Sequence, residues 1–130
     1  MEVTMTTIEI IEKYQAIEKL ISEDENLPIE LAWNLEDNQE EFKRIINKFD
    51  THREKIISPL KKKDAFIDNS DGTMTVKNEF KDEFLKLNDE INKLLQIKNN
   101  IEIKTCKREI LPAQIKISNL RAIKFMIVDE

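Results

Sequence analysis

Glycine is almost absent from this 130-residue chain, which contains only Gly72. Glycine-rich phosphate-binding loops need several glycines, and β architectures with many tight turns need residues that accept positive φ. The sequence therefore excludes both classes. With 36% charged residues and only three prolines, the composition favours long helices with solvated faces.

Cysteine is scarce as well, because Cys106 is the only one in the sequence. A single cysteine cannot form an intrachain disulfide, which favours a reducing compartment. The sequence has no run of eighteen apolar residues, and its first residues, MEVTMTTIEI, lack the basic segment of a signal peptide. We therefore expect no membrane partner and a cytoplasmic location.

Residues that carry chemistry are equally few. His52 is the only histidine, and no Cys or carboxylate stands at ligand spacing from it. No nucleophile signature surrounds Cys106, so a Cys106–His52 pair is a weak candidate for catalysis. The segment IDNSDG lacks the acids that a calcium loop requires at positions 67 and 78. We expect no catalytic, cofactor-binding or metal site, and a protein that is not an enzyme.

The strongest regularity is a heptad pattern in a helix predicted over residues 28–60. Pro59 predicts a kink or a stop in this helix between Ile57 and Leu60. Asn38 and His52 fall in the same row as Pro59, where a polar residue can fix the register of a seam. The first row of the pattern holds Leu35, Phe42, Phe49 and Ile56, and the second holds Asn38, Ile45, His52 and Pro59.

Capping and turn signals place the other elements. Thr6-x-x-Glu9 is a capping box that opens a helix over residues 7–22. Asp71-Gly72 predicts the turn of a β-ribbon over 64–77, and Asn78 can cap a helix over 78–98. Alternating residues predict strands within 100–117, Ile115 and Ile117 among them, and Ser118 can cap a last helix over 118–127.

These elements predict a single, mainly α domain over residues 1–130 with a minor β component. Its centre is a long antiparallel helical hairpin with a β-ribbon at the tip. An N-terminal helix and a short C-terminal strand and helix segment are expected to pack against this hairpin.

Charge is distributed unevenly along the chain. Residues 1–41 hold twelve acidic and two basic residues, a net charge of −10, whereas the remainder holds 14 acidic and 19 basic residues, a net charge of +5. The pI of about 5.1 argues against nucleic acid as a partner. Trp33 could be an interface anchor or a core residue. The candidate interface residues are Glu23, Asp24, Glu25, Trp33, Glu36, Asp37, Glu40 and Glu41.

Four segments together resemble a family of small proteins from bacteriophages and prophages of Gram-positive bacteria. They are LPIELAWNLEDNQEEF, KIISPLKKKDAF, DGTMTVKNEFKDEF and LRAIKFMI. These motifs are patterns of packing and turn residues spanning residues 27–127, so the resemblance supplies no catalytic residues.

The resemblance implies a host or phage protein as the partner. One hypothesis is an accessory protein in the host cytoplasm that binds and modulates or inhibits a host protein, such as an anti-phage defence system. Its acidic N-terminal third could imitate nucleic acid. The alternative is a structural or assembly factor of the virion head or tail, and an enzyme that uses Cys106 is a third, weaker hypothesis. We expect a monomer or a small homo-oligomer.

Overall fold

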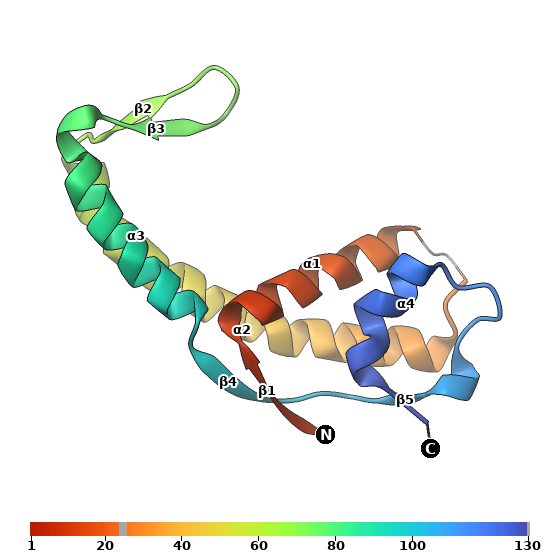
Figure 1. Ribbon diagram of the computed structural model, residues 1–130. Helices are drawn as coiled ribbons and strands as arrows, with labels where there is room; N and C mark the ends of the chain where they lie inside the picture. Colours follow the sequence, from red (N-terminus) through yellow and green to blue (C-terminus); the bar gives the residue numbers. More distant parts are fainter. Residues whose placement is uncertain (24–25, 130) are drawn as a thin grey trace. The chain divides into compact units, whose positions relative to one another are not determined.

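The computed structural model describes residues 1–23 and 26–129, and it is mainly α with small pairs of strands (Figure 1). The chain divides into two compact units. The first unit comprises Met1–Ile46 and Lys98–Glu130, and the second comprises Asn47–Ile97. Helix α2 (Ile29–Lys62) runs through both units without a linker, and the prediction of one domain stays a prediction.

The core of the first unit forms where helix α1 (Thr7–Glu23) meets the first half of α2 and the C-terminal segment (Figure 1). The predicted capping box opens α1: the Glu9 N–H donates to Thr6 Oγ1, and the Thr6 N–H donates to Glu9 Oε1, both at 3.3 Å. The buried apolar side chains of this core are Met5, Ile10, Ile17, Leu20, Leu31, Leu35, Phe42, Ile45, Ile101, Ile103, Cys106, Ile123 and Met126.

The N-terminal residues form a strand that the sequence did not predict. Strand β1 (Glu2–Thr6) pairs antiparallel with β4 (Lys98–Glu102), and Val3 lies opposite Ile101. The ladder continues past β4, since the Ile103 N–H donates to the carbonyl of Met1 at 2.9 Å. This pairing joins the two stretches of sequence that make up the first unit.

Two asparagines of α2 hold the segment that follows β4. The Asn38 side chain donates to the Lys104 carbonyl at 3.0 Å and accepts from the Lys104 N–H at 2.7 Å. One turn earlier, the Asn34 amide donates to the Thr105 carbonyl at 3.2 Å and to Cys106 Sγ at 3.1 Å. Asn38 is therefore a buried partner of an irregular backbone, and it does not set the register of a helical seam as its heptad position suggested.

The C-terminal segment contains three short elements: β5 (Cys106–Lys107), helix α4 (Ile117–Ile123) and β6 (Ile127–Val128), which pairs in parallel with β5. The prediction of a strand at Ile115 and Ile117 is wrong, because Ile117 begins α4. Ser118 is not the cap either, since Lys116 holds that position. One pair of alternating apolar residues is too short a pattern to specify a strand. The 3₁₀ turns of this segment are Arg108–Ile110 and Lys124–Met126.

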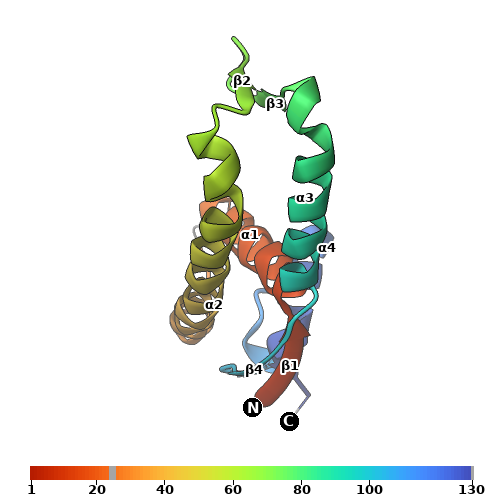
Figure 2. The same cartoon turned by 90° about the vertical axis from the view of Figure 1, so that its left-hand side faces the viewer.

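The second unit is the tip of the predicted helical hairpin. Helix α3 (Lys81–Leu95) runs antiparallel beside the second half of α2, and the strands β2 (Phe66–Asp68) and β3 (Met74–Val76) lie at one end (Figure 2). Asn78 begins a 3₁₀ turn, Asn78–Phe80, and is not the cap of α3, because Phe80 holds that position without a side-chain hydrogen bond. Residues 96–97 lie beyond α3, so the helix is shorter than predicted.

The seam of this hairpin is only half-buried. No residue of α3 is fully buried, and His52 is exposed. The ring of Phe84 meets that of Phe66 edge-on, with 6.2 Å between centroids, and Lys63 Nζ lies 3.0 Å from Glu83 Oε1. The half-buried seam residues are Phe49, Ile56, Phe84, Leu87, Ile91 and Leu94.

Helix α2 passes through Pro59 and ends at Lys62, so the predicted stop is wrong. Pro59 is exposed and only one turn from the helix end, where the loss of one backbone hydrogen bond is tolerated. The helix closes with a Schellman motif: the Ala65 N–H donates to the Leu60 carbonyl and the Asp64 N–H to the Lys61 carbonyl, both at 3.2 Å. Asp64 takes the left-handed position, at φ 56°.

The predicted turn at Asp71-Gly72 closes the ribbon. The Gly72 N–H donates to the Asn69 carbonyl at 3.2 Å, and Gly72 has φ +86°. The Asp71 carboxylate accepts from the Thr73 N–H and hydroxyl at 3.1 and 2.6 Å. These two bonds from Thr73 lower the pKa of Asp71. Asp71 and Gly72 thus form a turn.

Candidate functional site

The first half of α2 presents an exposed face that combines apolar and acidic side chains. Ile29 and Trp33, one turn apart, are 86% and 70% exposed. Glu36 and Glu40 are exposed on the next two turns, with Asp37 half-buried beside them. Spacings of four, three and four residues place Ile29, Trp33, Glu36 and Glu40 along one side of the helix, opposite the buried Leu35 and Phe42. We call Ile29, Trp33, Glu36, Asp37 and Glu40 the acidic face.

The structure thus brings together four of the eight predicted interface residues: Trp33, Glu36, Asp37 and Glu40. Of the two alternatives for Trp33, the core position is wrong. Glu41 lies to one side of the acidic face and pairs with Arg44, and this pair raises the pKa of Arg44. Glu23 is the exposed last residue of a different helix, α1, and Asp24 and Glu25 lie outside the described residues.

The carboxylates of the acidic face are available to form ion pairs with a partner. Within the described part of the chain, Glu36, Asp37 and Glu40 have no basic side chain within ion-pair distance. Glu36 also lines a shallow hollow of about 320 Å³ together with Ile21, Leu27, Ala32 and Gln39. An apolar side chain of a partner could enter this hollow beside the carboxylates.

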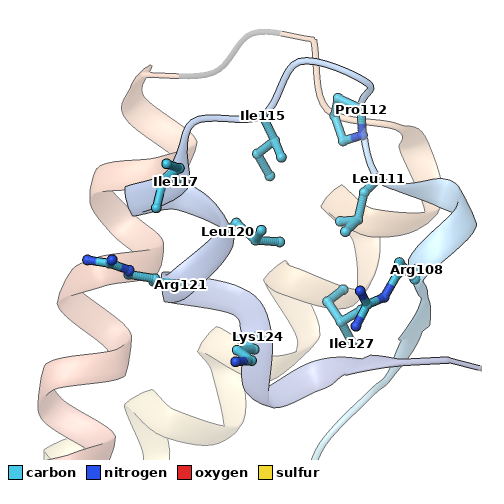
Figure 3. A pocket seen from close by; sticks show the side chains of 9 residues that line it. All are labelled: Arg108, Leu111, Pro112, Ile115, Ile117, Leu120, Arg121, Lys124 and Ile127. Atoms are coloured by element: carbon cyan, nitrogen blue, oxygen red, sulfur yellow. The ribbon is translucent and has the colours of Figure 1, made fainter.

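A second concave site lies in the C-terminal segment, and we call it the C-terminal pocket. Its volume is about 660 Å³, which falls in the range of small-molecule sites, roughly 300–1,000 Å³. In Figure 3, Leu111, Ile115 and Leu120 surround the opening, and Arg108 lies beside Ile127. The lining residues are Arg108, Leu111, Pro112, Ile115, Ile117, Leu120, Arg121, Lys124 and Ile127.

All three charged residues that line the C-terminal pocket are basic. Arg108 Nε lies 2.9 Å from the carboxylate of Asp129, and both side chains are largely exposed. Within residues 1–23 and 26–129, Arg121 and Lys124 have no acidic side chain within ion-pair distance. The pocket therefore pairs an apolar wall with a positively charged rim.

The sequence did not predict this pocket, because residues 100–117 were assigned to strands. One signal was present: residues 110–128 contain no Asp or Glu, although the chain as a whole is acidic. Basic residues alternate with Ile and Leu through this stretch, beside Pro112. That pattern indicates a basic apolar surface, but the folding of the stretch around a hollow depends on contacts with other elements.

The two residues considered for catalysis, Cys106 and His52, lie in different surroundings. Cys106 is buried at 1% exposure, and burial raises the pKa of its thiol. The negative charge of Glu30 acts in the same direction, whereas the hydrogen bond from Asn34 lowers this pKa. His52 belongs to the second unit and Cys106 to the first. Among the described residues, no group of three or more metal-binding side chains gathers, and no helix is long and apolar enough to cross a membrane.

Comparison with known proteins returns no relative. The chain matches no protein-family profile, no curated protein and no solved structure. The resemblance to bacteriophage proteins therefore stays a prediction.

Proposed function

We propose that this chain is a non-enzymatic binding protein that uses the acidic face of α2 to hold a protein partner. The observation that carries the proposal is the exposure of Ile29 and Trp33 on adjacent turns. Tryptophan is enriched among the residues that dominate protein interfaces, because it buries a large area at a small cost in conformational entropy. A large aromatic side chain left in water is an unusual feature in a protein with a well-formed core.

The carboxylates of the acidic face indicate the chemistry of the partner. Glu36, Asp37 and Glu40 place negative charge beside the exposed apolar pair. A complementary partner has an apolar recess for Trp33, surrounded by Lys or Arg side chains. The wider charge of −10 over residues 1–41 would accelerate the approach of such a partner at low ionic strength.

The biological setting of this proposal comes from the sequence resemblance. We propose a bacteriophage or prophage accessory protein, acting in the host cytoplasm, that modulates or inhibits a host protein. A component of an anti-phage defence system is one candidate for that partner, and a nucleic-acid-binding protein is another, since an acidic face can compete with a polyanion.

Affinity purification from a lysate of the host bacterium tests this proposal, followed by binding measurements between the purified proteins. The double variant Ile29→Ala, Trp33→Ala should weaken binding by about 30-fold or more, the effect of removing an interface hot spot. Leu85→Ala is the matched control, because Leu85 is another exposed apolar residue, at 59% exposure on α3. Equal binding by the two variants would refute the use of the acidic face.

Charge reversal tests the chemistry of the partner. Glu36→Lys with Glu40→Lys should weaken binding by about tenfold at low salt, and less at high salt because ions screen exposed charges. Asp89→Lys with Glu90→Lys on α3 changes the net charge equally at exposed positions and serves as the control. A partner that binds both double variants alike would have no complementary basic surface.

A virion structural or assembly role is the alternative, and one observation favours it. The seam of the second unit is half-buried along Phe49, Ile56, Phe84 and Leu87, so further helices packed against it would bury additional apolar surface. This alternative predicts that the chain is found in purified virions and self-associates in light scattering. A monomer found only in infected cells would support the host-binding function instead.

A further inference from the structure

The C-terminal pocket has features of a ligand site that are independent of the acidic face. Its wall is apolar, with Leu111, Ile115 and Leu120 around the opening (Figure 3), and Ile117 is 68% exposed at its edge. Its charged rim residues, Arg108, Arg121 and Lys124, carry the opposite sign to the chain as a whole. A ligand that suits both features is apolar along its length and negatively charged at one end.

The structure already contains a carboxylate at this rim. Asp129, in the last residues of the chain, places its carboxylate 2.9 Å from Arg108 Nε. Both side chains of the pair are largely exposed, at 70% and 78%, so the pair contributes little to stability and can be exchanged. Asp129 therefore acts as an internal stand-in for the anionic group of a ligand.

From this geometry we infer that the C-terminal pocket binds a small amphiphilic carboxylate. The apolar body lies against Leu111, Ile115 and Leu120. The carboxylate replaces Asp129 at Arg108 and also attracts Lys124, whose ammonium group has no acidic partner in the described part of the chain. This inference goes beyond the binding of a protein partner by α2 and does not depend on it.

Calorimetric titration with monomeric decanoate, decanol and acetate tests the inference directly. Decanoate should bind saturably at one site per chain, about fivefold or more tightly than decanol, because two exposed cations each add an interaction of up to about 1 kcal/mol. Acetate, which lacks the apolar body, should show no saturable binding. Equal affinity for decanoate and decanol, saturable binding of acetate, or no binding of decanoate would each overturn the inference.

Variants of the rim assign the carboxylate to its partners. Arg108→Gln with Lys124→Gln should weaken decanoate binding about fivefold, to the level of decanol, and leave decanol binding unchanged. Lys107→Gln with Lys116→Gln removes the same charge from exposed residues that do not line the pocket, and should have a smaller effect. Similar losses in the two double variants would show a diffuse charge effect and overturn the assignment.

Removing the carboxylate of Asp129 should strengthen decanoate binding instead of weakening it. Asp129→Asn frees Arg108 and should strengthen decanoate binding about twofold, the gain expected from relieving one exposed competitor.

Ile117→Asp with Leu120→Asp should abolish binding of both decanoate and decanol. Ile117 and Leu120 are both exposed, and an unchanged thermal transition would confirm that this variant folds. Full decanoate binding by a folded Ile117→Asp, Leu120→Asp protein would place the ligand elsewhere and overturn the inference.

Discussion

Helix α2 carries one heptad pattern through both units, yet the same pattern has two different outcomes. In the first unit, Leu35 and Phe42 are fully buried. In the second unit, the equivalent Phe49 and Ile56 are half-buried. The sequence pattern at these four positions is the same, so the difference comes from the elements that cover each half of the helix.

The first unit supplies several covering elements. Side chains of α1, β4, β5 and α4 pack with α2 into one core, and the ring of Phe42 meets that of Phe125 with 5.8 Å between centroids. The second unit supplies α3 and the ribbon, and within it only Leu60 and Ala65 are fully buried among the described apolar residues. A heptad seam therefore specifies which side of a helix is apolar, while the number of neighbours decides how much of it is buried.

Removing one ring from each half of α2 should give the largest effects and tests this comparison. Phe42→Ala should lower the free energy of unfolding by about 3–5 kcal/mol, the cost of a cavity in a closed core. Phe49→Ala should cost about 1–2 kcal/mol, because a half-buried ring has less apolar area to lose. Urea denaturation followed by circular dichroism measures both. Equal costs would mean that the second unit is as closed as the first.

Substitution of Asn38 should give the next largest loss of stability. Asn38→Ala should cost about 1–3 kcal/mol, since it leaves the N–H and carbonyl of Lys104 without their partner in a partly buried setting. Asn47→Ala, at an exposed position on the same helix, is the control and should change stability by less than about 0.5 kcal/mol. If Asn38→Ala were equally mild, the two hydrogen bonds to Lys104 would not hold the segment that follows β4.

The ribbon end of the second unit should respond to two opposite backbone changes. Gly72→Ala places a side chain at φ +86° and should cost about 1 kcal/mol, although no neighbouring atom lies within 4 Å of the new Cβ. Asp64→Gly relieves the left-handed position at the end of α2 and should gain up to about 1 kcal/mol. Thermal unfolding measures both, and effects of the same sign would contradict these backbone assignments.

Substitution of Cys106 should give the smallest effect, a change in stability that depends on pH. Its folded-state pKa lies above the ordinary value of 9.0, chiefly because the thiol is buried. The protonated thiol thus stabilises the fold below pH 9, and this contribution is lost as the pH rises from there through the higher folded-state pKa. The difference in urea midpoint between the wild type and Cys106→Ala should narrow from pH 8 to pH 10. A constant difference would indicate an unperturbed thiol.

Local signals in the sequence predicted the local features of the fold. The capping box at Thr6 and Glu9 and the turn at Asp71-Gly72 depend on hydrogen bonds between residues at most four apart. The length of α2 follows from a long apolar period without glycine. These features need no information about distant parts of the chain.

Non-local features could not be predicted in the same way. Strand β1 pairs with residues almost a hundred positions later, such as Val3 with Ile101, and five residues carry too short a period to reveal it. The sequence pattern placed Asn38 in a helical seam. It could not reveal that Asn38 binds the backbone of Lys104, because that segment is irregular and distant in the chain. The exposure of Trp33 follows from what covers the opposite side of α2, and the C-terminal pocket depends on how β5, α4 and β6 come together.

The acidic face should be exposed in the free protein and covered in the complex with the proposed partner. Trp33 is the only tryptophan, so quenching of intrinsic fluorescence by acrylamide reports on this face alone. In the free protein, Trp33 should be quenched almost as efficiently as free tryptophan in water, and addition of the purified partner should protect it. Protection already present in the free monomer, or quenching unchanged in the complex, would contradict this account.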